Sequence, residues 1–191
     1  MLNNEIILNL LNESINTKKE FTSSKNNIEL IEKAAALIIT CYKSGGKILV
    51  FGNGGSAADS QHLAAEMVVR FEKKRKALSA IALTVNSSSL TAIGNDFEYK
   101  HIFSRQIEAI ALKNDVAIAI STSGNSENII LAVEKARELG LKIIALTGND
   151  GGKLAAKSDI PIIVKSNSTA RIQEVHITII HILCKLIDNA F

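Results

Sequence analysis

The apolar positions of the first 45 residues recur at three- and four-residue steps, a spacing that predicts helices. The clearest stripe runs over Ile28–Tyr42 and ends at Gly45, a residue type that favours a helix C-terminus. Leu30 and Leu37 widen this stripe beyond a single face. We therefore expect the helix to be buried on two sides, one of them against another subunit.

From Lys47 the pattern changes to short, β-branched apolar runs separated by helical segments. The predicted strands are Lys47–Phe51, Ala80–Thr84, Val116–Ser121, Ile143–Thr147 and Ile160–Val164. They are almost continuously apolar, as is typical of strands covered by helices on both faces. The predicted helices between and after them are Ala57–Phe71, Tyr99–Leu112, Glu127–Leu139 and Thr169–Asn189. This alternation predicts an α/β protein, a three-layer α/β/α sandwich with a five-stranded parallel sheet, plus N-terminal helices.

The composition, 47% hydrophobic and 21% charged, is that of a globular protein and excludes disorder and low-complexity repeats. We predict a single domain over residues 1–191, with oligomerisation helices in 1–45 and the α/β core in 46–191. A net charge of +3 and 4% aromatic residues do not favour a nucleic-acid partner. The one dense basic run, Lys73–Lys76, is interpreted as a solvated loop at a helix end in preference to an anion site.

Cys41 and Cys184 fit no disulfide or metal spacing, so we expect buried thiols in a reducing compartment. No stretch approaches the roughly 18 apolar residues of a membrane helix. Residues 1–20 lack the basic start and the small-residue cleavage site of a signal peptide. We therefore expect a cytoplasmic protein with no membrane partner.

Ligands of such sheets bind at the carboxyl ends of the strands, which directs attention to the loops there. The loop Gly52–Ala57 formally matches a dinucleotide-binding pattern of glycines. The second predicted strand, however, ends Leu83-Thr84-Val85, without the acidic residue that binds a ribose. Gly148–Lys153 is one residue short of a P-loop. Neither nucleotide site is favoured.

The loop after the third predicted strand, Ser121–Ser126, has four hydroxyls in six residues and opens a predicted helix. A capped turn would need only one of these side chains. The excess favours an anion site, in which hydroxyls and the helix N-terminus bind a phosphate. Neither this loop nor Gly52–Ala57 contains Lys or Arg, so we expect one phosphate group rather than a triphosphate.

Two predicted helices carry candidate acid–base groups. His62 and Glu66 are four residues apart and share a helix face. Gln173 and His181 lie about 80° apart around the last helix, close enough to edge one cavity. His176 faces elsewhere and is interpreted as structural or interfacial.

Together these residues resemble the phosphoheptose isomerases, sugar-isomerase (SIS) domain enzymes that act on sedoheptulose 7-phosphate. The resemblance runs almost end to end and rests on Gly52–Ser56, His62 with Glu66, Asn95-Asp96, Ser121–Ser126, Gly151-Gly152 and Arg171–Glu174 through His181. The hydroxyl-rich loop alone would indicate only a phosphosugar-binding superfamily, whereas His62 and Glu66 together with Gln173 and His181 are more specific. The chain departs from one branch of the family at Ala170, where that branch has an acidic residue.

The resemblance implies the flavodoxin-like SIS fold and an aldose–ketose isomerase. The enzyme would convert D-sedoheptulose 7-phosphate to D-glycero-D-manno-heptose 7-phosphate through an enediol, with Glu66 as base and His181 as acid. The product would feed ADP- or GDP-heptose synthesis for lipopolysaccharide or capsule. The family also implies a homotetramer with shared active sites, to which Arg70 would contribute from a subunit boundary. The implied substrate-binding residues are Asn53, Gly54, Gly55, Ser56, Glu66, Asn95, Asp96, Ser121, Thr122, Ser123, Ser126 and Gln173.

The resemblance further implies one zinc ion per subunit and no organic cofactor. The implied zinc ligands are His62, Glu66, Gln173 and His181. A zinc-bound Glu66 is a poorer base, because the ion occupies its lone pairs. Two interpretations stay open: the metal polarises the sugar oxygens while Glu66 moves away during turnover, or the metal is a resting-state occupant.

Two other classes of function remain as alternatives. A non-catalytic SIS-domain binding protein of the replication-initiator-associating type has this fold but lacks the catalytic Glu and His, which are present here as Glu66 and His181. Other sugar-phosphate isomerases and sugar-phosphate-sensing domains carry extra domains or a differently arranged chain, and they lack the helix with Gln173 and His181. The sequence therefore favours the isomerase.

Overall fold

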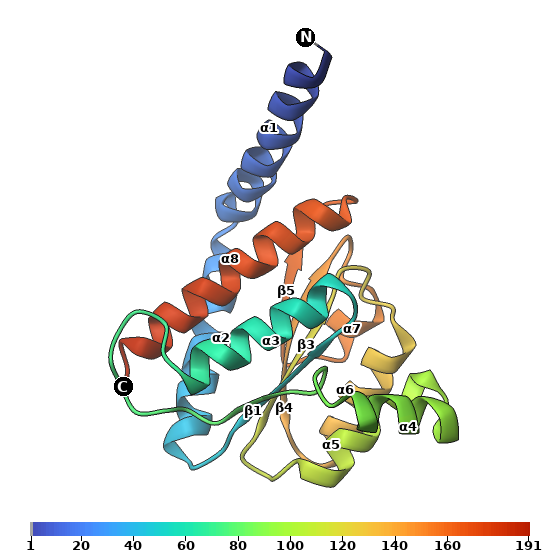
Figure 1. The fold of residues 1–191 in the computed structure, drawn as a ribbon. Helices are drawn as coiled ribbons and strands as arrows, with labels where there is room; N and C mark the ends of the chain where they lie inside the picture. Colours follow the sequence, from blue (N-terminus) through green and yellow to red (C-terminus); the bar gives the residue numbers. More distant parts are fainter. Residues whose placement is uncertain (1) are drawn as a thin grey trace.

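The computed structural model describes residues 2–191, along which helices and strands alternate (Figure 1). The strands are β1 (Ile48–Gly52), β2 (Ala80–Ala82), β3 (Val116–Ser121), β4 (Lys142–Gly148) and β5 (Ile160–Val164). The helices are α1 (Leu2–Ser23), α2 (Lys25–Lys43), α3 (Gly55–Val68), α4 (Ser87–Phe97), α5 (Ser104–Ile110), α6 (Glu127–Glu138), α7 (Gly152–Ala156) and α8 (Thr169–Asp188), with a short 3₁₀ turn, η1, at Tyr99–His101.

The strands form one parallel sheet in the order β2-β1-β3-β4-β5. All five lie where the sequence predicted them, and the predicted α/β class with a five-stranded parallel sheet is confirmed. β1 and β3 are buried along their whole length, which explains their continuous apolar sequence. The strand order is flavodoxin-like and reverses direction between β1 and β3, where such sheets bind ligands.

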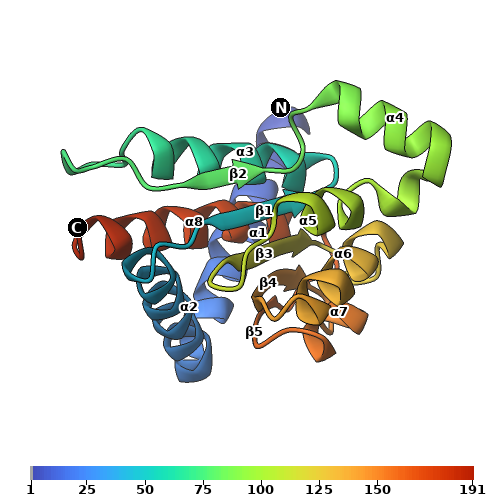
Figure 2. The same ribbon diagram turned by 90° about the horizontal axis from the view of Figure 1, so that it is seen from below.

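Two hydrophobic cores lie on opposite faces of the sheet, because successive strand side chains point to opposite faces. Ile48 and Val50 of β1 belong to the core shared with α2, α3 and α8. Leu49 and Phe51 belong to the core shared with α5, α6 and α7. Figure 2 shows these two groups of helices on either side of the sheet, which completes the three layers.

Helix α2 is buried on two sides within its own chain, against β5 and against α8. Ile31, Ala35 and Ile38 are buried there, whereas Ile28 at the start of the helix is 49% exposed. The broad apolar stripe of α2 is therefore explained by contacts inside one chain. A contact of α2 with another subunit is therefore not required to explain the stripe, and it stays a prediction.

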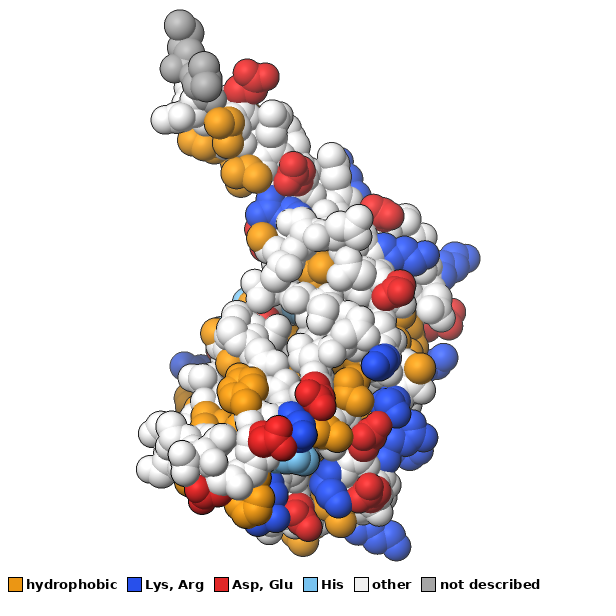
Figure 3. Space-filling model, turned by 90° about the vertical axis from the view of Figure 1, so that its right-hand side faces the viewer, with side chains coloured by type: hydrophobic (Ala, Val, Ile, Leu, Met, Phe, Trp, Pro, Cys, Tyr) orange, Lys and Arg blue, Asp and Glu red, His pale blue; other side chains and the backbone are white. Residues whose placement is uncertain are grey.

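Exposed apolar surface lies instead on α1, which projects from the body of the molecule (Figures 1 and 3). Its hydrophobic side chains that are about half exposed or more are Ile6, Ile7, Leu8, Leu10, Leu11 and Ile15. Arg171 of α8 connects α1 to the body by donating a hydrogen bond to the Leu10 carbonyl oxygen at 2.6 Å. A contiguous apolar surface of this kind is typical of an interface. That residues 1–45 serve oligomerisation stays a prediction.

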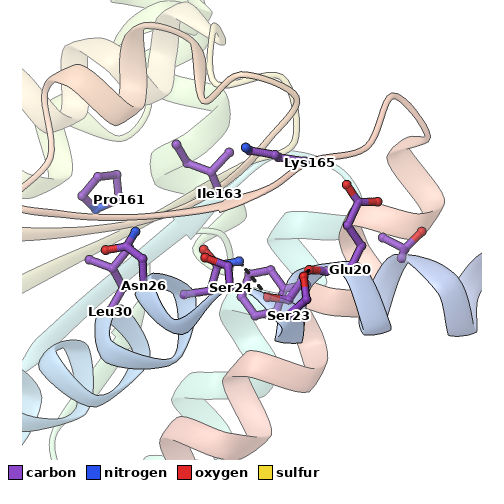
Figure 4. A pocket seen from close by; sticks show the side chains of 11 residues that line it. Glu20, Ser23, Ser24, Asn26, Leu30, Pro161, Ile163 and Lys165 are labelled. Atoms are coloured by element: carbon purple, nitrogen blue, oxygen red, sulfur yellow. Dashed lines mark hydrogen bonds between the residues drawn. The ribbon is translucent and has the colours of Figure 1, made fainter.

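A cavity of about 290 Å³ lies between the α1–α2 junction and β5 (Figure 4). Glu20, Asn27 and Lys165 are among its lining residues. The side-chain amide of Asn27 donates to the Phe21 carbonyl oxygen at 2.8 Å and fixes the bend between the two helices. None of the site residues predicted from the sequence lines this cavity.

Two helices were not predicted from the sequence, and one predicted helix is divided. α4 has no fully buried residue, and its apolar stripe is short: Leu90 and Ile93 pack on the edge of one core, between a start of three serines and Gly94. α7 is only five residues long, too short for periodicity to detect. The predicted helix Tyr99–Leu112 is in fact η1 followed by α5.

The three lysines of the basic run Lys73–Lys76 are exposed, as expected of a solvated loop, but the side chain of Arg75 is buried, which corrects that interpretation for this one residue. The Arg75 Nε atom lies 2.6 Å from Asp188 Oδ1, and both side chains are at most 1% exposed. The guanidinium also donates to the carbonyl oxygens of Glu66 and Met67 at the end of α3. Arg75 is therefore a structural residue that joins α3 to the end of α8.

Both cysteines are free and buried, as predicted. Burial raises the thiol pKa of Cys41 to about 11 and that of Cys184 to about 12. Within residues 2–191 no helix has the length and apolar character needed to cross a membrane.

Candidate active site

A cavity of about 310 Å³ lies at the carboxyl ends of β1 and β3, where the strand order reverses. It is lined by Asn53, Gly54, Gly55, Ser56, Ile120, Ser121, Thr122, Ser126, Thr169 and Gln173. Eight of these ten residues were predicted from the sequence as substrate-binding residues. These ten residues include no Lys or Arg.

The side chain of Asn53, which follows β1, has a fixed orientation. Its amide exchanges two hydrogen bonds of 2.9 Å with the amide of buried Asn128. Its oxygen also accepts a hydrogen bond from the Tyr99 hydroxyl at 3.2 Å. One amide N–H of Asn53 is left for a ligand, because only one of its two amide hydrogens is donated, to Asn128.

The second wall of the cavity is the loop between β3 and α6, Ser121–Ser126, which we call the phosphate loop. Ser126 occupies the N-cap position of α6, but its hydroxyl makes no capping hydrogen bond. It lies 3.4 Å from the Ser121 hydroxyl, so both are close to one point in the cavity. The positive end of the α6 dipole adds to the attraction for an anion.

Ser123 differs from the other predicted members of this loop. It is exposed and does not line the cavity. Its hydroxyl oxygen accepts a hydrogen bond from the Asn125 N–H at 3.2 Å. Its side chain thus stabilises the turn, and direct phosphate binding by its hydroxyl stays a prediction.

Three of the predicted chemical groups meet between α3 and α8. The Nε2 atoms of His62 and His181 lie 3.0 Å apart. Glu66 Oε1 lies 3.5 Å from His62 Nε2, as the four-residue spacing predicted. Phe71 stacks on the His181 ring with a centroid distance of 5.6 Å and fixes its plane. The His62 and Glu66 side chains remain 43% and 23% exposed, so small molecules can reach them.

Gln173, the fourth predicted zinc ligand, lies in the cavity beside the first loop. A Cβ atom built on Gly55 would come within 2.4 Å of Gln173 Nε2, so only glycine permits this approach. In residues 2–191 Gln173 makes no hydrogen bond to the His62, Glu66 and His181 group, and no three His, Cys, Asp or Glu side chains are arranged to hold a metal ion.

The chemistry of the donors nevertheless fits zinc. Ligands of a tetrahedral zinc ion with Zn–N distances of about 2.0–2.1 Å lie roughly 3.3 Å from one another. The 3.0 Å between the two imidazole nitrogens and the 3.5 Å to Glu66 are close to that separation.

Asn95 and Asp96 do not line the cavity. Both are exposed near the end of α4, where the Asn95 amide donates to Asp96 Oδ1 at 2.8 Å. Arg70, just after α3, is exposed too, as is Ala170. The predicted roles of Asn95, Asp96 and Arg70 in the site stay predictions.

His176 is structural, as the sequence indicated. It is fully buried, and its Nε2 atom lies 3.1 Å from the Thr147 carbonyl oxygen, to which it donates. Burial lowers its pKa to about 4, so the ring is neutral at pH 7.

Sequence reasoning missed Asp59, Tyr99, Asn128 and Thr169. Among the residues that the structure describes, Asp59 Oδ2 is buried without a hydrogen-bond partner. Burial raises the pKa of this carboxyl to about 6, against the opposing effect of His62. Its position three residues before His62 is a signal that could have found it, since such residues share a helix face. Tyr99 and Asn128 both form hydrogen bonds with Asn53, and sequence spacing does not reveal these contacts.

Residues 12–148 match the family described as SIS domain. The fold and the site together thus define a SIS-domain protein with a hydroxyl-lined cavity at the carboxyl ends of its strands. The chain is 58% identical over 159 residues to the phosphoheptose isomerase of Citrifermentans bemidjiense, covering 83% of each chain. It is 52% identical to that of Clostridium acetobutylicum, covering 94% of this chain and 91% of the relative.

Two solved structures are also similar. The phosphoheptose isomerase of Neisseria gonorrhoeae superposes with a TM-score of 0.90 at 46% identity, over 99% of this chain and 100% of that one. The enzyme of Francisella tularensis gives a TM-score of 0.94 at 40% identity with the same coverage. The chain belongs to the phosphoheptose isomerase family and is an isomerase.

Proposed function

We propose that this enzyme converts D-sedoheptulose 7-phosphate to D-glycero-D-manno-heptose 7-phosphate through an enediol. One observation carries the proposal: a carboxylate and two imidazoles meet on α3 and α8, helices that also border a cavity lined by hydroxyls. Proton transfer between neighbouring carbons needs a base and an acid, and the phosphate of the substrate needs neutral donors.

The two parts of the site are separated by a distance that suits a seven-carbon chain. His62 lies seven residues beyond Gly55 on α3, about 10 Å along the helix. His181 lies eight residues beyond Gln173 on α8, about 12 Å along the helix. An extended seven-carbon chain spans roughly 8 Å with carbon–carbon bonds of about 1.5 Å. A phosphate on C7 bound by Ser121 and Ser126 would thus bring C1 and C2 towards His62 and His181. Glu66 lies one helical turn beyond His62 on α3, with its Oε1 3.5 Å from His62 Nε2.

In the proposed reaction Glu66 removes a proton from C1 of the ketose while His181 protonates the carbonyl oxygen on C2, which gives the enediol. Glu66 then returns its proton to C2, and His181 takes the proton of the C1 hydroxyl as the aldehyde forms. Each group ends in its starting protonation state, so no covalent intermediate or organic cofactor is needed. Asn53 would orient the sugar through its remaining amide N–H.

We propose that His62, Glu66, Gln173 and His181 can hold one zinc ion. When bound, zinc supplies a positive charge that polarises sugar oxygens. Gln173 would have to turn away from Gly55 to join the other three side chains. Glu66 would have to leave the metal to act as base, since a bound carboxylate has fewer free lone pairs.

We further propose a homotetramer that works in the cytoplasm, where two free buried thiols are in keeping with a reducing compartment. The product would be consumed in the synthesis of ADP- or GDP-heptose for lipopolysaccharide or capsule.

Incubation of the purified chain with sedoheptulose 7-phosphate, followed by NMR, tests this function. We expect the anomeric signals of the seven-carbon aldose phosphate to appear, and no product from unphosphorylated sedoheptulose at the same concentration. Absence of the aldose phosphate would contradict the proposal and would favour the non-catalytic binding class.

A further inference from the structure

The segment that follows β4 packs against the back of the phosphate loop through three hydrogen bonds. The Asn149 amide donates to the Thr122 carbonyl oxygen at 3.3 Å. At the start of α7, the Leu154 N–H donates to the Gly124 carbonyl oxygen at 2.9 Å and the Lys153 N–H donates to Asn125 Oδ1 at 3.1 Å. These bonds hold the phosphate loop from one side at Thr122, Gly124 and Asn125. Two of these residues, Thr122 and Gly124, are the direct neighbours of Ser123.

The two segments are too close for either to move alone. A Cβ atom on Gly124 would lie 2.2 Å from the Gly151 carbonyl oxygen. A Cβ atom on Gly148 would lie 2.6 Å from the Thr122 carbonyl oxygen. These are backbone atoms, which cannot turn aside as a side chain can. The packing therefore fixes the path of the phosphate loop.

Asn149 itself has an unusual backbone conformation. Its φ of 55° lies in the left-handed region, which Asn tolerates better than most residues. The turn that follows is fixed to the core, because Thr147 Oγ1 donates to the Gly151 carbonyl oxygen and His176 donates to the Thr147 carbonyl oxygen. The Asn149 side chain therefore extends from a fixed support.

The bond to Thr122 determines where the next N–H points. In a trans peptide the C=O and the following N–H point in opposite directions. A Thr122 carbonyl directed at Asn149 thus directs the Ser123 N–H away from the β4–α7 loop. This N–H has no hydrogen-bond partner within residues 2–191. Ser123 itself does not line the cavity, but it directly follows Thr122, which does.

We propose that Asn149 is a positioning residue, which fixes the Thr122–Ser123 peptide so that the Ser123 N–H donates to the phosphate of the substrate. The inference rests on the proposed function of the phosphate loop. It assigns the backbone of Ser123 a binding role that is separate from its side chain. Asn149 acts through Thr122 and does not touch the reacting carbons.

The test compares Asn149→Gly and Asn149→Asp with the unaltered enzyme on sedoheptulose 7-phosphate. Glycine keeps the left-handed backbone and removes the side-chain donor, whereas aspartate keeps the shape but cannot donate. We expect each to raise KM about 3- to 10-fold, the usual weight of one hydrogen bond, with kcat unchanged. Thermal stabilisation by inorganic phosphate should weaken in parallel.

Asn114→Gly is the matched control. Its amide also donates to a backbone carbonyl oxygen, that of Ser44 at 3.3 Å, near the opposite end of β3. We expect its KM to equal that of the unaltered enzyme. A merely structural role of Asn149 would lower the stability of the Asn149→Gly variant without moving KM, and that outcome would overturn the proposal.

Ser126→Ala separates the two possible failures. If Ser126→Ala raises KM while both Asn149 variants leave it unchanged, the phosphate loop binds as proposed and the positioning role is wrong. If none of the three changes KM, the loop does not bind the phosphate, and the proposed function of the site is wrong. Should Asn149→Gly fail to fold, Asn149→Asp gives the same decision.

Discussion

At the scale of single residues, the site depends on a pair of imidazoles that are 119 residues apart in sequence and 3.0 Å apart in space. At this distance one Nε2 donates and the other accepts, and the tautomers of the two rings decide which one carries the shared proton. Glu66 adds a carboxylate that is partly exposed and faces His62. These are the groups that a proton transfer between adjacent carbons requires.

Replacing Glu66 by Gln keeps the size of the side chain and removes the base. We expect kcat to fall about 10²- to 10⁴-fold, the usual weight of a general acid–base group. KM should stay within a few-fold, because the phosphate donors lie in a separate loop. In the Glu66→Gln variant, NMR should also show no exchange of deuterium from solvent into the C1 and C2 positions of the sugar.

Glu134→Gln serves as the control for this substitution, since Glu134 of α6 forms a surface ion pair with Lys157 and does not line the cavity. It should exchange deuterium at the normal rate. A Glu66→Gln enzyme that exchanges as fast as this control would show that Glu66 is not the base, and only its role as a metal ligand would remain.

The sequence predicted most of the residues that line the site, because the motifs lie in loops whose position follows from the parallel sheet. It could not predict that Ser123 turns outward, since this depends on the N–H of Asn125. Nor could it predict Asn128 and Tyr99, whose roles come from contacts with Asn53 across the fold. Spacing locates residues on one element, but contacts between elements need the packed structure.

At the scale of elements, the end of α3 is fixed by a residue from the following loop. The Arg75 guanidinium donates to the last carbonyls of α3 and pairs with Asp188 near the end of α8. The helices that carry Glu66 and His181 are thereby joined at one end. Sequence reasoning did not find this contact, because a lysine-rich run is usually solvated. It also missed α4, whose apolar stripe is short and only partly buried.

Asp188→Asn should be strongly destabilising, because it leaves the buried Arg75 charge uncompensated. We expect a loss of about 3–5 kcal/mol in the free energy of unfolding at pH 7, measured with urea. The surface pair of Arg105 and Glu108 provides the control, and Glu108→Gln should cost about 1 kcal/mol or less. A loss at Asp188 no larger than at Glu108 would contradict the importance of the buried pair.

The loss of stability caused by Asp188→Asn should become smaller as the pH falls. Burial alone would raise the pKa of the Asp188 carboxyl, but the Lys73 N–H, Arg75 and the Glu72 N–H outweigh it and lower the pKa below its ordinary value. A lowered pKa in the folded state stabilises the protein above the pKa of the unfolded chain, and this stabilisation is lost as the pH falls through the lower value. The difference from Asp188→Asn should therefore shrink in acid.

At the scale of the whole molecule, the projecting α1 leaves apolar side chains about half exposed (Figure 3). Ile7, Leu11 and Ile15 repeat at four-residue steps and share one face of the helix. Burial of such a face in an interface is favourable by roughly 25 cal/mol per Å². We therefore expect the main contact of the proposed homotetramer on α1, while α2 packs against β5 and α8 of its own chain.

Lysine at both Ile7 and Leu11 should weaken the assembly, because burying two unpaired charges is costly. In sedimentation at micromolar concentration we expect the unaltered chain at about four times its mass of 20.6 kDa and the double variant at a smaller mass. Asn9→Lys with Asn12→Lys adds the same charge on α1 and should remain assembled. An unaltered chain that sediments at 20.6 kDa would contradict the homotetramer.

The two free, buried cysteines can report on local unfolding of the helices that carry them. With thiol pKa values of about 11 and about 12, only roughly one Cys41 side chain in ten thousand, and fewer of Cys184, is a thiolate at pH 7. Alkylating reagents react with the thiolate, so the native chain should resist them for long periods. Cys41 lies on α2 and Cys184 on α8, and the two helices pack on each other. The rate of modification at each sulfur would therefore report how often each helix opens, without any added probe.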